Sequence, residues 1–460
     1  MSKLAKKLGF SLGLENDAPA ADITINVETD EEGTPLAGTT IDGENTVETD
    51  QVETAEAEGE VEQTNDQVEE LEEAQETLEN YYVALEHYNR NGGMSRETAG
   101  MMAIGVAGVT RKFGIGLEDL NISVESFGNN RQRATTVSME GIKDMLAEIW
   151  RKIKELMFKM WKALKNFYMK LFSGAVRLKK RAEAIKKKAD QETRGISEKK
   201  IEVGLLKQLH ISGKVPTASQ IDETLTYYQE ATGGLAKGGF DKASEATITV
   251  IDDLSSMDAE KVRYQLRQAT AMFEDEAQKI KATSKKAEPH QVKRFYSNAT
   301  GVQNSSSSGE LLGGQIALVV ANVEGEDIGI KMGFTRASDK VKEVDSTGSF
   351  ETLGTSQISS ICNKVIDIAD NVRLYEKVWD KREKMLKDIQ SAGDKAVKNV
   401  EKEDDENSEL KKSVTRVIQA VTKDVRALAS FEQQVNSKAL ATSSAVLNLC
   451  VSSLRAHSDK

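Results

Sequence analysis

The feature that most limits how this chain can fold is the spacing of large apolar residues between Ser138 and about Lys188. An apolar side chain recurs there every three or four positions, which matches the 3.6-residue turn of an α-helix. Lysine and arginine residues occupy many of the positions between them. The pattern therefore predicts one long amphipathic helix with a cationic face. Its apolar series comprises Ile142, Met145, Leu146, Ile149, Trp150, Ile153, Leu156, Met157, Met160, Trp161, Leu164, Tyr168, Leu171 and Phe172.

The aromatic stripe of this predicted helix, which includes Trp150, Trp161, Leu164 and Phe172, permits three interpretations. Such a stripe is most often the core-facing side of a helix in a bundle. Trp and Phe opposite Lys and Arg also suit a helix that lies on an anionic lipid surface. A third interpretation is a helix that binds in a groove of a partner protein. We expect the core-facing role, because the rest of the chain supplies several helices with matching apolar faces.

The remaining sequence favours further long helices. It contains only 4 prolines, and charged residues make up 30% of the chain, so few positions interrupt a helix and solvated stretches are common. Two β-rich runs, Ile316–Val323 and Ile328–Thr335, flank Glu324-Gly325 and predict a hairpin. We therefore expect a mainly α fold, with long helices in a bundle-like body, one small β-hairpin and a disordered acidic N-terminal segment in front.

Changes of pattern divide the chain into six predicted regions. The last contains two long helices, about Thr355–Val400 and Glu409–His457, which a short acidic turn makes antiparallel neighbours. The regions are a disordered acidic segment (1–62), a helical part with a linker (63–125), the basic amphipathic helix (126–192), a helical region (193–300), a linker with the hairpin (301–350) and the antiparallel pair (351–460).

Chemistry-bearing residues are sparse in this sequence. The 2 cysteines, Cys362 and Cys450, lie in apolar helical patterns and are expected to be buried small side chains. The 4 scattered histidines cannot form a multi-histidine metal centre, and no nucleotide-binding or hydrolase motif occurs. No run of 18 uncharged apolar residues predicts a membrane span. We therefore expect no catalytic site, no metal and no cofactor.

Charge is distributed unevenly along the chain. Residues 1–125 contain 28 Asp and Glu against 7 Lys and Arg, a balance of −21, whereas residues 126–460 contain 46 acids against 55 bases, a balance of +9. The two balances account for the net charge of −12. Such asymmetry indicates an acidic arm that aids solubility, or one that shields a basic body and is later removed.

A dense cluster of bases follows the aromatic stripe in the sequence RLKKRAEAIKKK. A cluster like this is usually a solvated helix end, but it also suits neutralisation of several phosphates. Nothing in it could read base edges, so we expect any contact with DNA to be weak and independent of sequence. The candidate DNA contacts are Arg177, Lys179, Lys180, Arg181, Lys186, Lys187 and Lys188.

A small-x-Glu tripeptide lies where the charge changes sign. Ser123-Val124-Glu125 precedes Ser126 in a stretch rich in Gly and Asn, and Ser138-Met139-Glu140 precedes Gly141 as a second choice. The succession of an acidic N-terminal segment, this tripeptide and a basic Trp/Lys helix resembles the internal head (inner-body) proteins of large tailed bacteriophages. The similarity is carried by the stretch from Ser123 to Leu164. The resemblance implies that a prohead protease cuts after Glu125, or after Glu140, and removes an N-terminal propeptide.

This resemblance implies a non-enzymatic structural virion protein that is packed inside the phage head with the genome, after assembly in the bacterial host cytoplasm. The expected partners are the prohead protease, capsid or scaffold proteins, and packaged DNA bound weakly. The alternative is a membrane-active or secreted helical effector that uses the Trp/Lys helix on lipid, so a membrane contact is possible but not favoured.

Overall fold

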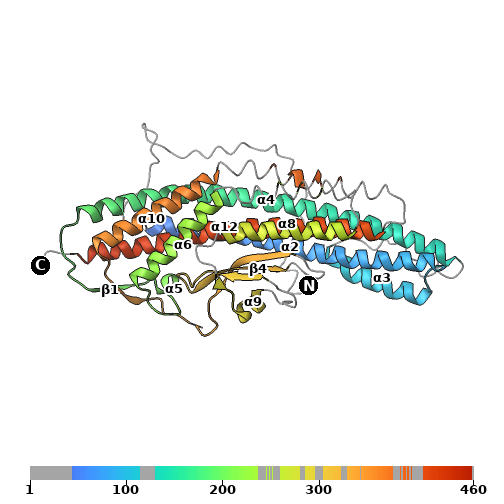
Figure 1. Cartoon of the computed structure of the whole chain (residues 1–460), viewed down its shortest axis with the longest axis horizontal. Helices are drawn as coiled ribbons and strands as arrows, with labels where there is room; N and C mark the ends of the chain where they lie inside the picture. The colour runs from blue at the N-terminus through green and yellow to red at the C-terminus, as the bar shows by residue number, and fades with distance from the viewer. Residues whose placement is uncertain are drawn as a thin grey trace. The chain divides into compact units, whose positions relative to one another are not determined.

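A computed structural model gives the arrangement of the chain, which divides into the units Met1–Thr39 and Thr40–Lys460. All described residues belong to the second unit. Figure 1 shows the long helices of this unit running side by side, with the sheets against them. The described residues are 44–113, 130–236, 259–279, 285–295, 304–322, 329–341, 343–376 and 408–457, together with single positions in 245–251 and 384–395.

Helices make up most of the described unit. In chain order they are α2 (Glu44–Arg90), α3 (Arg96–Thr110), the 3-10 helix η1 (Arg111–Phe113), α4 (Arg131–Gln191), α5 (Leu206–Leu209), α6 (Ala218–Ala236), α8 (Ala259–Lys279), α9 (Pro289–Phe295), α10 (Thr355–Leu374) and α12 (Ser408–Arg455).

The sequence prediction of one long helix in the centre of the chain is confirmed by α4. It contains 61 residues and is therefore about 90 Å long at 1.5 Å per residue. Asn130 caps its first turn, since the side-chain oxygen accepts a hydrogen bond from the Arg133 amide. Its buried residues recur every three or four positions along the whole helix, as the apolar pattern requires.

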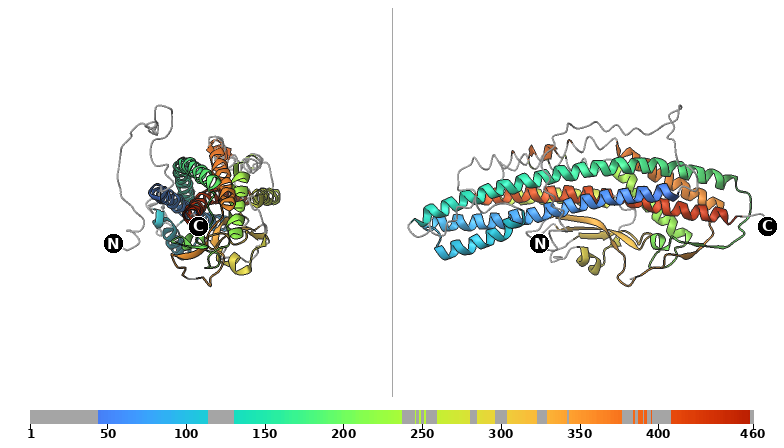
Figure 2. Two further views of the ribbon diagram at one scale, coloured as in Figure 1. Left: turned by 90° about the vertical axis from the view of Figure 1, so that its left-hand side faces the viewer. Right: turned by 180° about the vertical axis from the view of Figure 1, so that it is seen from behind.

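The central position in the unit belongs to α12. Between Val417 and Leu454 almost every side chain is buried or half-buried, so this helix has no broad solvent-facing side. Figure 2, viewed along the helices, shows α12 with other helices around it. Asp424 of α12 is fully buried and accepts hydrogen bonds from the Ile330 amide and the Thr270 hydroxyl, which fastens β5 and α8 to this helix.

The strands form two small antiparallel sheets within the described residues. One pairs β1 (Lys200–Val203) with β6 (Gly348–Glu351). The other has the order β2-β3-β4-β5, with Gln315 opposite Arg336 and Asn322 opposite Gly329. Its strands are β2 (Lys285–Lys286), β3 (Asn304–Ser307), β4 (Gln315–Asn322) and β5 (Gly329–Arg336).

Both faces of β4 are buried, which explains its uninterrupted apolar sequence. Ala317, Val319 and Ala321 face the main core, whereas Leu318 and Val320 pack with Ala287 and Val292 on the opposite side. Alternate side chains of a strand point to opposite faces, so both faces need apolar residues when both are covered. The predicted hairpin is confirmed, and the strand boundaries differ from those expected by one residue at each end.

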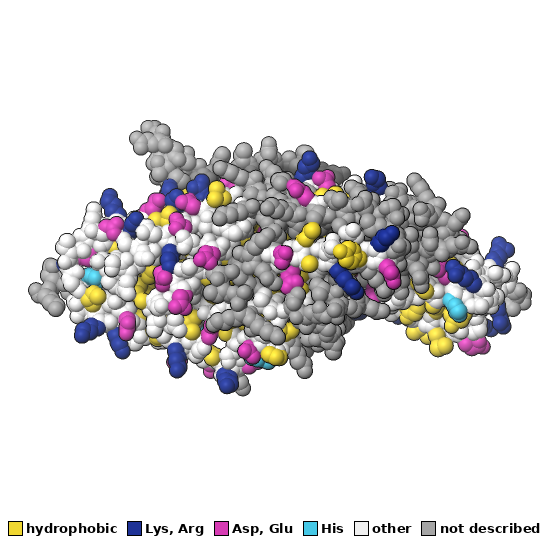
Figure 3. Space-filling model, viewed as in Figure 1, with side chains coloured by type: hydrophobic (Ala, Val, Ile, Leu, Met, Phe, Trp, Pro, Cys, Tyr) yellow, Lys and Arg dark blue, Asp and Glu magenta, His cyan; other side chains and the backbone are white. Residues whose placement is uncertain are grey.

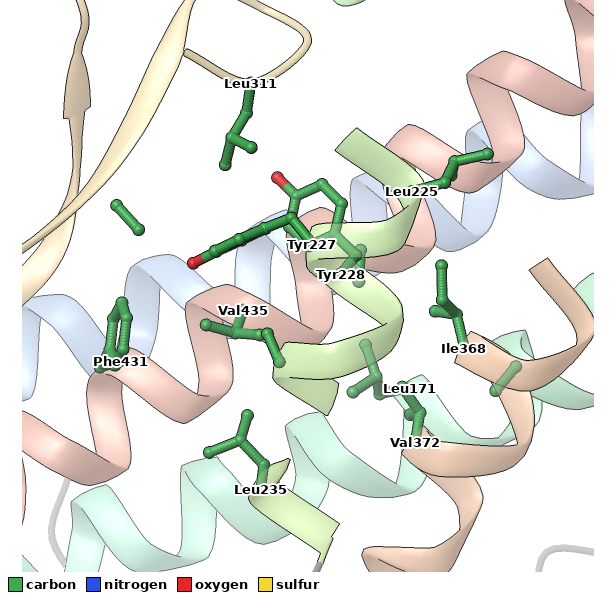
Figure 4. Packing of buried hydrophobic residues seen from close by; sticks show 14 of the residues in the cluster. Leu171, Leu225, Tyr227, Tyr228, Leu235, Leu311, Ile368, Val372, Phe431 and Val435 are labelled. Carbon is green, nitrogen blue, oxygen red and sulfur yellow. The ribbon is translucent and has the colours of Figure 1, made fainter. Parts of the chain in front are cut away.

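Two apolar clusters hold the helices together. The main cluster joins α4, α6, α10 and α12 with the sheets. Figure 4 shows Tyr227 and Tyr228 of α6 between Val435 and Phe431 of α12 and the apolar residues of neighbouring helices. The second, which we call the N-terminal cluster, consists of Val68, Leu71, Ala74, Leu78, Leu85, Met94, Ala99, Met102, Val106, Ala134, Ile142, Met145, Ile149, Ile153 and Met157.

Helix α2 begins earlier than the apolar pattern indicated. Helix was expected from about Thr64, with disorder before it, yet α2 begins at Glu44. Residues 44–62 contain mainly Glu, Ala, Thr, Val and Gln without proline, and acidic residues in a first turn favour the helix dipole. The disorder expected for 1–43 lies outside the described residues.

The closing helix pair is antiparallel, as expected, but its first helix is shorter than expected. The Tyr375 hydroxyl donates to the Glu432 carboxylate, and the Leu353 amide, just before α10, donates to the Ser453 hydroxyl at 3.2 Å, so the chain directions oppose. Helix α10 ends at Leu374 rather than near Val400. Tyr375 lies at this end and stacks on Tyr168 at a centroid distance of 5.0 Å, and the described positions between 376 and 395 are again helical.

Candidate functional site

The cationic side of α4 is the candidate interaction surface of this chain. The helix contains 17 Lys and Arg residues against 6 Asp and Glu. Many of these bases are exposed, because the apolar positions of the same helix are the ones that face the core. The exposed bases in its middle include Arg151, Lys159, Lys162, Lys165 and Lys170. Arg151 is paired with Glu148 and Glu155 on the same helix.

The seven predicted DNA contacts do not share one environment. Arg177, Lys187 and Lys188 are exposed, and Lys180 and Lys186 are half-buried. Lys179 donates to both oxygens of Asp370 on α10, at 2.9 and 2.8 Å. The exposed members can reach a phosphate, whereas Lys179 already has a carboxylate partner.

Arg181 is a correction to the expected surface cluster. Its side chain is only 7% exposed, and Nη2 donates to the Asn448 side-chain oxygen on α12 at 2.6 Å. The RLKKRAEAIKKK run spans more than three helical turns, so one of its positions must face the bundle. The expectation that all seven bases lie on the surface is therefore wrong for Arg181.

The aromatic stripe faces the interior of the unit. Leu164 is 1% exposed and Phe172 is 7% exposed, while Trp150 and Trp161 are half-buried against the main cluster. Trp150 also packs against the N-terminal cluster and so lies where the two clusters meet. This geometry agrees with the core-facing interpretation of the stripe.

The acidic helix α2 lies antiparallel along the first half of α4. The backbone amide of Met94 donates to the Thr135 hydroxyl, and Lys143 lies 5.5 Å from the ring centroid of Tyr82. As residue numbers increase along α4, the residue numbers of its contacts on the α2 side decrease, so the two helices are antiparallel. Figure 1 shows α2 beside α4, with α3 at the same end of the bundle.

An ion pair attaches α2 to the central helix. Arg426 of α12 is 2% exposed, and its Nη2 donates to both carboxylate oxygens of Glu72, each at 2.6 Å. A charge-assisted contact of this kind is strong because burial removes competing water. Sequence analysis missed this pair, because the two residues are 354 positions apart and no local pattern connects them.

The two predicted processing sites have different structural settings. Ser123-Val124-Glu125 and Ser126 lie outside the described residues. Ser138-Met139-Glu140 and Gly141 lie inside α4, where Ser138 is 1% exposed and donates to the Ala134 carbonyl. Proteolysis concentrates at exposed loops, so a cut at Glu140 requires α4 to open locally.

The described residues do not assemble an obvious catalytic centre. Burial raises the pKa of the Cys362 thiol to about 12 and that of Cys450 well above its usual value, so both thiols are protonated near neutral pH. No group of three His, Cys, Asp or Glu side chains suited to a metal ion occurs in the part that the structure describes. Among the described helices, none combines the length and apolar character needed to cross a membrane.

Comparison with known proteins identifies a family that covers most of the chain. The family model of phiKZ-like phage internal head proteins matches residues 47–451 of this chain. The matched range begins inside α2 and ends inside α12, so it includes the acidic helix, the basic helix and both sheets. No curated protein and no solved structure matches.

Proposed function

The chain belongs to the family of phiKZ-like phage internal head proteins, and from this premise we propose that it is a non-enzymatic structural component packed with the genome inside the head. The match over residues 47–451 is the observation that carries this proposal. The fold supports it, because a bundle of long helices with a continuous core suits a structural role. The aromatic stripe of α4 packs against the core, and no observation favours the membrane-active alternative, so it is not proposed.

We propose that this protein contacts DNA weakly and without sequence preference. The exposed bases of α4, such as Arg177, Lys187 and Lys188, supply the positive charge. On the face in Figure 3, basic side chains are interspersed with acidic ones rather than gathered in one patch. A surface of this kind favours loose, salt-sensitive association over tight compaction.

We propose further that a prohead protease removes the acidic N-terminal part during maturation, and that capsid or scaffold proteins receive the chain beforehand in the host cytoplasm. The charge step at residue 125, from −21 before it to +9 after it, supports this proposal. Loss of the acidic part would leave a body whose charge favours coexistence with packaged DNA.

The mature protein is expected to begin at Ser126 or, as the second choice, at Gly141. Intact mass measurement on protein taken from its native particles checks this, since the two sites give distinct masses. Peptides from residues 17–62 should be depleted relative to peptides from residues 355–457. Recovery of the full-length mass alone from mature particles would refute the processing proposal.

Reversing the charges of Lys186, Lys187 and Lys188 to glutamate should weaken binding of the full chain to duplex DNA. The slope of log affinity against log salt should fall by up to about 3, about one for each lost phosphate contact. Fluorescence anisotropy across a salt series measures it. The matched control reverses Lys207, Lys214 and Lys340, which are exposed but lie outside α4. Equal slopes for the two triple variants would show that α4 is not the contact surface.

A further inference from the structure

The apolar side chains in the first half of α4 are buried by residues of α2 and α3. All described members of the N-terminal cluster come from α2, α3, α4 and the turn that contains Met94. From Ile142 to Met157, the fully buried side chains of α4 therefore pack in a cluster that α2 and α3 complete. These two helices lie in the part of the chain that maturation is proposed to remove.

Hydrogen bonds and an ion pair, as well as apolar contacts, attach α2 and α3 to α4 and α12. Beyond the Met94 amide, which donates to Thr135 at 3.0 Å, Lys152 donates to the Phe113 carbonyl at 2.6 Å. Gly93 has a φ of +93°, and a Cβ there would lie 2.5 Å from the Arg131 backbone carbonyl carbon, so the turn between α2 and α3 sits directly on the start of α4. The Glu72–Arg426 pair adds a buried contact to α12.

The two partners of this interface also have complementary charge. Over its whole length α2 contains 16 Asp and Glu against one Arg, while α4 contains 17 Lys and Arg against 6 acids. Opposite charge on facing helices strengthens their association and disfavours pairing of two basic helices. The surface of α4 from Ile142 to Met157 thus fits an acidic amphipathic helix, and α2 is that helix.

We propose that α2 and α3 stay bound to the body after the chain is cut ahead of α4, so that cutting and release are two separate steps. This rests on the proposed maturation and specifies how it proceeds. A cut removes only the covalent connection, whose contribution is the entropy of loop closure, and leaves the apolar cluster, the hydrogen bonds and the Glu72–Arg426 pair in place. Release is limited by opening of the N-terminal cluster.

Two further small-x-Glu sequences lie within α2 and are protected by the same packing. In Ala74-Gln75-Glu76 the first two side chains are buried, and in Ala84-Leu85-Glu86 the central leucine is fully buried. These peptide bonds become available only when α2 leaves α4. Additional cuts in α2 are therefore expected to come after release and to make it irreversible.

The direct test uses the full chain with the recognition sequence of a site-specific protease in place of residues 119–125. After complete cutting, size-exclusion chromatography should recover both fragments in one peak, at physiological salt and again in 1 M NaCl. Hydrogen exchange of residues 142–157 should stay as slow as in the uncut protein. Elution of the large fragment alone would overturn the proposal. Co-elution that is lost in 1 M NaCl would also overturn it, since charge alone would then hold the fragments together.

A pair of variants tests whether the cluster controls release. Leu78→Ala with Leu85→Ala removes two fully buried side chains of α2, and the cut fragments should separate at least about a hundredfold faster. Val83→Ala is the control, because Val83 is on the same helix and 38% exposed. The uncut variants are first compared by circular dichroism. If the double variant does not hold its helices, Leu78→Ala alone takes its place, with an expected acceleration of at least about tenfold. Unchanged release in the buried variants would refute control by the cluster.

The measurement on native particles and the engineered-cut experiment test the proposed processing and the two-step release separately. An intact N-terminus in native particles would refute processing but leave the behaviour of the engineered cut unaffected. Immediate release after the engineered cut would refute the two-step inference, whereas depletion of residues 17–62 in mature particles would still support processing.

Discussion

Replacing Phe167 with alanine is expected to lower the free energy of unfolding by about 3–5 kcal/mol. Phe167 is fully buried in the main cluster, and its ring meets that of Tyr168 edge to face at a centroid distance of 5.3 Å. Truncation would leave a cavity in the main cluster and remove the apolar contacts of the ring. Urea denaturation followed by circular dichroism measures the loss.

Phe158 provides a matched control for this substitution. It lies on the same helix, nine positions earlier, but its side chain is 57% exposed. Phe158→Ala should change stability by no more than about 0.5 kcal/mol, as is usual at surface positions. If the aromatic residues of α4 served lipid or a partner instead of the core, both substitutions would leave stability nearly unchanged.

Sequence periodicity predicted those elements whose burial is continuous. Helix α4 was expected over Ser138–Lys188 and extends over Arg131–Gln191, since its apolar series is long and strong. The hairpin of β4 and β5 was identified from β-branched runs around Glu324-Gly325. In both cases the local pattern and the tertiary environment require the same structure.

Elements that depend on partners far away in sequence were missed. Strand β3 has the sequence NSSS, which indicated a flexible connector, yet it pairs with β4 through its backbone. The pairing of β1 with β6 joins residues about 150 positions apart and has no local signal. The same is true of the buried position of Arg181, which is set by Asn448 of α12.

The acidic N-terminal region illustrates a limit of charge reasoning. Its composition indicated a solvated arm only before about Thr64. From there the helical spacing of Val68, Leu71 and Leu78 predicted a helix, and these residues join a cluster with α4 that charge alone does not indicate. Among the described residues of α2, Val68, Leu71 and Leu78 are buried in the cluster, whereas the carboxylates of Glu73 and Glu76 are on exposed residues. The charge contrast and the apolar contact therefore occur on the same helix.

Replacing Glu72 with alanine is expected to destabilise the full chain by about 3–5 kcal/mol. Arg426 is 2% exposed, and its Nη2 donates to both oxygens of the Glu72 carboxylate at 2.6 Å. The variant would therefore keep a charged guanidinium in a low-dielectric site without its partner. Glu73→Ala is the control, because this neighbouring carboxylate is exposed and should change stability little. Similar losses for the two variants in urea denaturation would show that the ion pair contributes nothing specific.

A double variant tests whether Glu72→Ala loses stability because it leaves the charge of Arg426 buried and unpaired. Removing both charges, as Glu72→Met with Arg426→Met, should recover most of the stability lost in Glu72→Ala, because apolar side chains of similar size suit the contact between α2 and α12. The recovered variant should also hold α2 after an engineered cut. If the double variant is as unstable as Glu72→Ala, the unpaired charge of Arg426 is not what destabilises Glu72→Ala.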